Sequence, residues 1–264
     1  MVSHRNIIRN GKLPCQTTLR SVPRLVEAVG QDKWANFLPL EVDLNSEESV
    51  KKAIDEALKH FSAKTIDVVV NSAGYDTIGS VEEFTVDEVQ AMFNVNCFSV
   101  HKVVGNVLPY MWAAKSGLII NISSIAALTP PFLSGIYGAA RAALSAVTEA
   151  LAQEVAPFNI KVLLIEPGPF ETKFYNKTNI KCVAHIDPAY QSQHDQRALL
   201  DNRPKMPGDP ERAAKIIIEV SQLQEMPKLL FLGKPCISFA EGKADLIKSE
   251  ITKYKKYIEG ADFQ

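Results

Sequence analysis

The stretch NISSIAALTPPFLSGIYGAAR, residues 121–141, decides the fold of this chain. An apolar strand candidate at residues 118–122 runs into it and ends in two serines. The helix candidate that follows, residues 137–155, is rich in alanine, and a further strand candidate occupies residues 160–165. A strand, a helix and a strand in this succession predict a βαβ unit and therefore a parallel sheet.

The same alternation extends through most of the 264 residues. Further strand candidates lie at residues 37–42, 66–71 and 228–232, and helix candidates at 47–61, 86–93 and 97–114. Residues 66–71 are apolar on both faces, which predicts a strand buried within the sheet. Residues 175–208 are polar and carry several prolines, so we expect a loop or a short helical excursion there.

A C-terminal surface helix is predicted because Ile247, Ile251, Tyr254 and Ile258 fall on one helical face. We find no internal repeat and no linker. The chain is therefore expected to form a single α/β domain over residues 1–264, with residues 1–14 as an atypical N-terminal segment.

Composition excludes several classes of protein. The net charge of −1 gives no reason to expect a nucleic acid or an anionic membrane as partner, and the apolar runs are too short to span a bilayer. The four cysteines lie far apart without a CxxC pair, which argues against a metal site and indicates a reducing, cytoplasmic location. The first 26 residues carry five basic side chains and no acid. A targeting segment has such a composition, but the absence of a clear apolar face favours a basic surface segment.

Three side chains carry the chemistry that we expect. Tyr137 lies thirteen residues after Ser124, and Arg141 follows four residues later on the same helical face. A neighbouring cation stabilises a phenolate and makes a tyrosine a usable acid/base near neutrality. Ser124 would hold a substrate oxygen. Taken singly, Ser124 could merely end a strand and Tyr137 could be a half-buried tyrosine at a helix start, but their spacing favours a functional role.

These residues resemble the active-site signature of the classical short-chain dehydrogenases/reductases, in which a strand, a serine and about a dozen residues precede YxxxK. Further stretches resemble other motifs of that family, in the family's order: Asp43-Leu44 (the adenine pair), Asn71-Ser72-Ala73-Gly74 (NNAG), Asn96 in NVNCF, and Glu166-Pro167-Gly168-Pro169-Phe170-Glu171-Thr172 (PG…T). The resemblance covers roughly residues 15–235.

The resemblance implies a Rossmann-like, doubly wound parallel sheet and an NAD(P)(H)-dependent oxidoreductase that interconverts a carbonyl and a secondary alcohol. The implied catalytic residues are Ser124, Tyr137, Arg141 and Asn96. The implied cofactor-binding residues are Arg20, Asp43, Leu44, Asn71, Ala73, Gly74, Tyr137, Arg141, Pro167, Gly168 and Thr172. NADP is expected rather than NAD, because Arg20 falls where this family often contacts the 2′-phosphate.

Two further expectations follow from the resemblance. The segment 175–208 corresponds to the substrate loop, and its aromatic and apolar residues favour a mid-sized apolar substrate. The stretch EPGPFET, residues 166–172, most resembles that of fungal or bacterial reductases and of 17β-hydroxysteroid-dehydrogenase-like members. Members of the family usually pair through the helices before and after the serine strand, so a homodimer or homotetramer is expected.

The first departure from the family is Arg141, where the family has lysine. The positive charge is kept, but a guanidinium and an ammonium are not interchangeable, because the family's lysine also binds the nicotinamide ribose. We therefore expect reduced activity.

The second departure is the missing glycine-rich turn that receives the pyrophosphate. Before Gly74 the chain has only Gly11 and Gly30, and the family's first strand, central in the order 3-2-1-4-5-6, has no counterpart. Three alternatives remain: the strand at 15–20 moves inward to pair with 66–71, the sheet is malformed, or the sequence is an incomplete version of a longer one. The alternative function is a catalytically silent relative, a binding or scaffold protein or a truncated gene product, that does not bind the cofactor normally.

Overall fold

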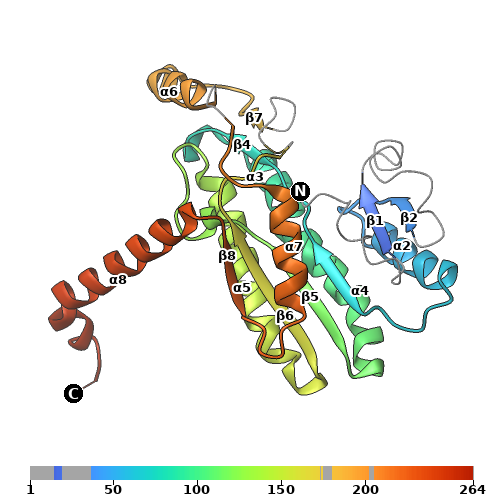
Figure 1. Cartoon of the computed structure of the whole chain (residues 1–264). Coiled ribbons are helices and arrows are strands. Elements are labelled where there is room, and N and C mark those ends of the chain that lie inside the picture. Colours follow the sequence, from blue (N-terminus) through green and yellow to red (C-terminus); the bar gives the residue numbers. More distant parts are fainter. Residues whose placement is uncertain (1–14, 20–36, 173, 175–179, 202–204, 264) are drawn as a thin grey trace.

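Figure 1 shows the chain as a computed structural model, which describes residues 15–19, 37–172, 174, 180–201 and 205–263. Arg20 and the N-terminal segment 1–14, for which the sequence carried expectations, lie outside the described residues.

The main sheet has four parallel strands in the order β3-β5-β6-β8. They are β3 (Val68–Asn71), β5 (Gly117–Ile122), β6 (Ile160–Pro167) and β8 (Leu229–Leu232). Two short parallel pairs accompany this sheet: β1 (Cys15–Leu19) with β2 (Phe37–Glu41), and β4 (Asp76–Ile78) with β7 (Ile180–Cys182). The predicted α/β fold with a parallel sheet is confirmed.

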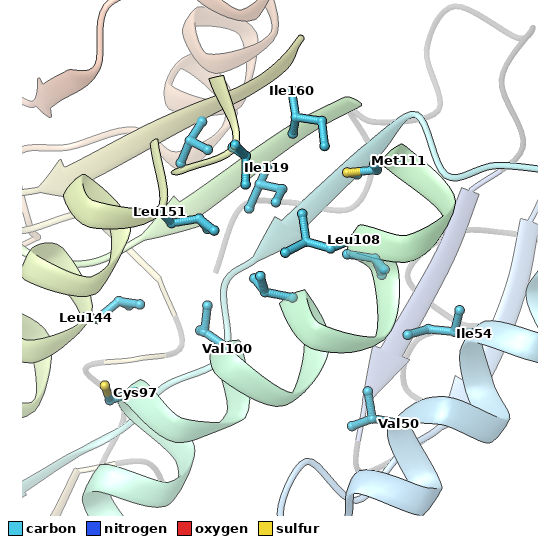
Figure 2. Close-up of a cluster of buried hydrophobic side chains, with 14 of the residues drawn as sticks. Val50, Ile54, Cys97, Val100, Leu108, Met111, Ile119, Leu144, Leu151 and Ile160 are labelled. Atoms are coloured by element: carbon cyan, nitrogen blue, oxygen red, sulfur yellow. The ribbon is translucent and has the colours of Figure 1, made fainter. Parts of the chain in front are cut away.

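Helices cover both faces of the main sheet. On one face, α4 (Ser99–Ala114) and α5 (Gly135–Glu154) pack on β5 and β6, with α2 (Glu47–His60) outside α4, and Figure 2 shows the aliphatic core between them. On the other face, α7 (Pro210–Ser221) covers Ile120, Leu163 and Ile165. Ser46 caps α2 and Asp209 caps α7, since each side chain accepts backbone N–H bonds of the first turn.

The sheet is divided at the point where the sequence lacks a strand. The expectation that the strand at 15–20 moves inward to pair with 66–71 is wrong, because β1 pairs with β2, and among the described residues β3 has β5 as its single neighbour. The expectation that 66–71 is buried on both faces is also wrong, since Val68 is 49% exposed and Val70 40%. Their register partners on β5, Leu118 and Ile120, pack with α7, whereas Val68 and Val70 belong to none of the hydrophobic clusters formed by the described residues.

The remaining elements surround the carboxyl ends of the strands. A π-helical turn (Asn94–Phe98) joins α3 (Val86–Phe93) to α4. One-turn 3₁₀ helices occupy Val81–Glu83, Ile125–Ala127, Ala156–Phe158 and Pro188–Tyr190, and are called η2, η4, η5 and η7. Within 180–201, β7, η7 and α6 (Gln191–Asp201) form the helical excursion that the sequence predicted. The last helix, α8 (Pro235–Glu259), extends away from the body (Figure 1). None of the helices that the structure describes is long and apolar enough to cross a membrane.

Candidate active site

The carboxyl ends of three neighbouring strands bring the predicted motifs to one edge of the sheet. Asn71 ends β3, Ser123 and Ser124 follow β5, and Pro167 ends β6, with Asn71 and Asn121 in register and Asn121 in register with Leu164. In open parallel sheets, ligands bind outside this edge. Motifs that are far apart in the sequence therefore lie at neighbouring strand ends.

Ser124 and Tyr137 lie in adjoining turns. Ser124 begins η4, where its Oγ accepts a bond from the Ala126 N–H at 3.1 Å, and η4 packs against α5. The ring of Tyr137, in the first turn of α5, is 7% exposed and shares a buried cluster with Ala126 and Met92. The structure therefore brings the two predicted residues to the same place.

Asn96 joins α3 and α4 to the strand exit at β3. It is fully buried in the π-helical turn, where its Nδ2 donates to the Tyr75 carbonyl at 2.9 Å and its Oδ1 accepts from the Tyr75 N–H at 3.1 Å. The extra residue of the π turn turns the side chain of Asn96 inward and leaves its carbonyl available to another donor.

Arg141 fills the space between these elements. Its side chain is 4% exposed, and its guanidinium donates to the carbonyls of Asn96 (3.4 Å), Ile122 (3.2 Å) and Ala73 (3.3 Å). The guanidinium carbon lies 5.4 Å from the centre of the Tyr137 ring, within cation–π range. The predicted contact between the cation and Tyr137 exists, but most of the guanidinium's donors are used to tie three strand and helix ends together.

Gly74 is needed for this arrangement. A Cβ at position 74 would lie 1.6 Å from Arg141 Nη2 and 2.7 Å from Asn96 Oδ1. The planar head of Arg141 thus lies directly on the backbone of the Asn71–Gly74 motif. The shorter lysine that the resemblance led us to expect at position 141 has no second terminal nitrogen to place there.

Asn71 acts on the sheet. Its Nδ2 donates to Asn121 Oδ1 at 2.8 Å, and Asn121 Nδ2 in turn donates to Thr148 Oγ1 on α5 at 2.9 Å. This chain of bonds links β3, β5 and α5. Asn121 and Thr148 were not singled out from the sequence, although an asparagine inside an apolar strand was a signal for them.

A second polar group that the sequence did not reveal lies beneath the site. Ser145 is bonded to Ser123 Oγ at 3.0 Å and to Glu166 Oε1 at 2.7 Å, and Ser123 Oγ donates to the Arg141 carbonyl at 3.0 Å. Burial raises the pKa of Glu166, although the bond from Ser145 opposes that rise. A glutamate inside the apolar run of β6 was the available signal.

Asp76 is a further buried acid beside the site. It accepts a bond from Ser134 Oγ at 2.8 Å, directly before α5, while its Oδ1 has no hydrogen-bond partner among the described residues. Burial raises the pKa of Asp76 to about 6, against the opposing effects of Ser134 and the nearby Arg197 cation. Arg197, on α6, donates to the Phe132 carbonyl at 2.8 Å, so this group fixes α6 to the loop before α5.

Glu83 fixes the excursion at its other side. Its carboxylate accepts from His194 Nε2 at 2.8 Å and from the N–H groups of Ser80 and Asp187 at 2.7 and 2.9 Å. Burial raises the pKa of Glu83, but these hydrogen bonds outweigh it and hold the pKa at about 2. Glu83 and Asp76 therefore anchor the predicted substrate segment over the edge of the sheet.

The other predicted cofactor residues are only partly gathered. Gly168 donates its N–H to the Leu232 carbonyl, and Thr172 Oγ1 accepts from the Phe174 N–H, so both continue from β6 above the site. Asp43 follows β2 and forms a local turn with Asn45, while Leu44 packs on the core around α2 and α4. Arg20 lies outside the described residues. The described part of the chain holds no group of three or more acidic, histidine or cysteine side chains suited to a metal ion.

The residues present fit one end of a nicotinamide dinucleotide. Ser124 before η4, Tyr137 on α5 and Asn96 in the π turn belong to elements that contact one another near the carboxyl edge of the sheet, and Thr172 follows β6. For the pyrophosphate, the described residues contain no glycine-rich turn between a strand and a helix start.

Comparison with known proteins gives a consistent result. The sequence model of the short chain dehydrogenase family matches residues 11–182. The chain is 40% identical over 141 residues to a 3-ketodihydrosphingosine reductase of Bacteroides thetaiotaomicron, covering 53% of this chain and 52% of that protein. It is 40% identical over 151 residues to the probable short-chain type dehydrogenase/reductase VdlC of Helicobacter pylori, covering 56% and 55%. The chain thus spans about half the length of these two curated relatives.

Solved structures extend the likeness over nearly the whole chain. A short-chain dehydrogenase from Streptomyces avermitilis is 30% identical, with a TM-score of 0.84 over 97% of this chain and 93% of that one. A short chain dehydrogenase from Burkholderia cenocepacia in complex with NADP is 20% identical, with a TM-score of 0.70 over 94% and 88%, and shares the fold.

Proposed function

Since this chain belongs to the short-chain dehydrogenase/reductase family, a family of oxidoreductases, we propose that it interconverts a carbonyl and a secondary alcohol with a nicotinamide cofactor. The observation that carries the proposal is the placement of Ser124 and Tyr137 in adjoining turns at the carboxyl edge of the sheet, with the Arg141 cation against the Tyr137 ring.

The chain's own residues divide the work as follows. Tyr137 exchanges the proton at its hydroxyl with the substrate oxygen, and Ser124 Oγ donates a bond that orients this oxygen. The Arg141 guanidinium lies 5.4 Å from the centre of the Tyr137 ring and holds that ring in place by a cation–π contact. Asn96 holds the π turn that keeps Arg141 and the exit of β3 in place. The cofactor, when bound, supplies or accepts the hydride.

We propose that the nicotinamide half of the cofactor is bound by Asn71, Ala73, Gly74, Tyr137, Arg141, Pro167, Gly168 and Thr172. Asp43 and Leu44 are proposed for the adenine end and Arg20 for a 2′-phosphate, which makes NADP the preferred cofactor. Solved relatives with NADP or NADH bound support a nicotinamide cofactor for this fold.

A mid-sized apolar carbonyl compound is the proposed substrate class. The buried cluster around Tyr137 is formed by aromatic and aliphatic side chains, among them Phe84 directly after η2, Met92 on α3 and Val183 directly after β7, with the Phe174 ring 5.9 Å from the Tyr137 ring. Such walls favour an apolar group beside the reacting carbon and offer few partners to a charged one.

The test has two parts on the full chain. NADPH is titrated by fluorescence up to about 1 mM, the upper end of ordinary Michaelis constants, and NADPH oxidation is then followed with a panel of apolar ketones. Tyr137→Phe should abolish turnover and leave thermal stability nearly unchanged, while Tyr110→Phe, on the outer side of α4 beside Asp55, should keep turnover.

Each outcome decides something. Saturable NADPH binding with turnover that depends on Tyr137 supports the enzyme. Absence of saturable NADPH binding would reject the enzyme proposal for this polypeptide and favour a catalytically silent relative. The absence of a glycine-rich turn and the divided sheet among the described residues are the observations that favour that alternative. Turnover that survives Tyr137→Phe would reject the proton-transfer role.

A further inference from the structure

The helix α8 presents an apolar seam that nothing in the described structure covers. It is 25 residues long, about 37 Å at 1.5 Å per residue, and extends away from the body (Figure 1). Its apolar positions alternate in spacings of three and four residues along one face: Ile237, Ala240, Ala244, Ile247, Ile251, Tyr254 and Ile258. That 3-4 pattern is the heptad seam of a two-stranded coiled coil, with Ile237, Ala244 and Ile251 at position a.

The seam is exposed and straight up to Tyr254. Ile247 and Ile251 are about half exposed, as are Ile237 and Ile258. The backbone leaves the helical conformation at Tyr254 (φ −109°, ψ 15°), so the regular seam runs from Ile237 to Tyr254. Charged side chains border it on both sides: Glu241 and Lys248 on one, Lys243 and Glu250 on the other.

We propose that α8 is a dimerisation helix that pairs antiparallel with the α8 of a second copy of this chain. In the register that places Ala244 opposite Ile247 of the other copy, Ala240 meets Ile251 and Ile237 meets Tyr254. The straight part of each helix is then covered from end to end, and the kink falls where the partner's body begins.

Charge complementarity selects this register and orientation. Antiparallel pairing brings positions on the same side of the seam together, so Lys243 lies opposite Glu250 of the other copy and Glu241 lies opposite Lys248. Symmetry doubles both attractions. A parallel pair would set Lys243 against Lys248 instead and would place both bodies at the same end.

The hollow at the base of α8 supports the same occupant. It measures about 390 Å³ and is lined by Ala240, Ala244 and Ile247 of the seam, by the flanking Glu241 and Lys243, and by Leu128 and Phe231 of the body. In a coiled coil each knob enters a hole between side chains of the facing helix, and in the proposed register Ile247 and Ile251 of the partner are the knobs opposite the two alanines. The surface is distinct from α4 and α5, the helices through which the resemblance implied pairing.

A membrane is the less suitable occupant. Helices that bind bilayer interfaces carry an excess of Lys and Arg on the polar face. In α8, five lysines are nearly balanced by four acids, and acids border the seam on both sides. An association through matched charges fits this composition better.

The experiment measures the mass of the full chain by light scattering over a concentration series. Ile251→Glu should halve the mass of the assembly, whatever other interface is present. Leu246 is as exposed as Ile251 (54% against 53%) but lies on another face of α8, so Leu246→Glu should leave the mass of the assembly unchanged. A monomeric wild-type chain, or an assembly unchanged by Ile251→Glu, would overturn the proposal.

Orientation is tested by charge reversal. Lys248→Glu places like charges at two symmetric positions and should raise the dissociation constant about three- to tenfold, as expected for exposed ion pairs. Combining it with Glu241→Lys should restore the wild-type value, since the antiparallel partners are then exchanged. Failure of the double variant to restore binding overturns the antiparallel register. If the chain binds vesicles of anionic phospholipid, if Ile251→Glu abolishes that binding and if the mass of the assembly in solution does not change, the seam is a membrane-binding surface and the dimer proposal is overturned.

Discussion

Replacing Gly74 with alanine is expected to destabilise the chain through Arg141. The new Cβ would lie 1.6 Å from Arg141 Nη2, so the guanidinium must retreat by about 1.4 Å to reach even a 3.0 Å contact. The bond from Nη2 to the Ala73 carbonyl, at 3.3 Å, is lost in that movement, and the two bonds from Nη1 are strained.

The magnitude follows from these contacts. A hydrogen bond to a charged group contributes about 1.5–3 kcal/mol, and a buried cation left without partners costs more. Losing one to two of the three bonds of a guanidinium that is 4% exposed therefore predicts a loss of about 2–5 kcal/mol in the free energy of unfolding. That is a large fraction of the total stability of an ordinary domain.

Urea denaturation at pH 7.5 measures the effect, with Gly105→Ala as the matched control. Gly105 lies inside α4 and a Cβ there meets nothing within 4 Å, so its replacement should stabilise the chain by up to about 1 kcal/mol. In an Arg141→Lys background, Gly74→Ala should cost less, because the shorter side chain removes the 1.6 Å contact and leaves the 2.7 Å contact with Asn96 Oδ1.

The double-mutant cycle contains the refutation. Positions 74 and 141 should be coupled by at least about 1.5 kcal/mol, the lower end of the range for one hydrogen bond to a charged group. If Gly74→Ala costs the same with arginine and with lysine at 141, Arg141 does not rest on Gly74 as the structure has it.

Three further predictions concern buried acids and the divided sheet. The pKa of Asp76 is about 6 in the folded chain against an ordinary value of 3.8, so the folded chain loses stability as pH rises from about 4 to 6. Asp76→Asn should lack that loss and be more stable than wild type by up to about 3 kcal/mol at pH 7. The measurement is the free energy of unfolding as a function of pH. For Glu83 the pH dependence has the opposite sign, because its pKa is about 2 in the folded chain against an ordinary value of 4.5. The free energy of unfolding of the wild-type chain should therefore fall as pH falls from about 4.5 to 2. If the unfolding free energy of Glu83→Gln falls with the same slope over that range, the assignment is contradicted. Val70→Thr on β3 should change the unfolding free energy by no more than about 0.5 kcal/mol, since Val70 is already 40% exposed, and a loss of several kcal/mol in urea denaturation would mean that the valine is covered.

The sequence by itself determined the succession of elements and the chemistry-bearing positions. The predicted strands at 37–42, 118–122, 160–165 and 228–232 and the predicted helices at 47–61, 86–93, 97–114 and 137–155 follow from local periodicity, and the structure has each of them to within a few residues. The pairing of Tyr137 with Arg141 was also readable, because four residues on one helix fix which face both side chains share. The absence of a glycine-rich turn before Gly74 was also readable, because only Gly11 and Gly30 precede that residue.

Only the tertiary structure decided how the chain accommodates that absence and what Arg141 contacts. The acceptors of its guanidinium lie 19, 45 and 68 residues away in sequence, and Asp76 meets Ser134 across 58 residues. No local pattern specifies such contacts, because they depend on which strand ends meet at the sheet edge. The same holds for β3, whose valines were predicted from the sequence to be buried. Whether they are buried depends on what packs beside and above β3, and among the described strands only β5 pairs with it, so Val68 and Val70 are exposed.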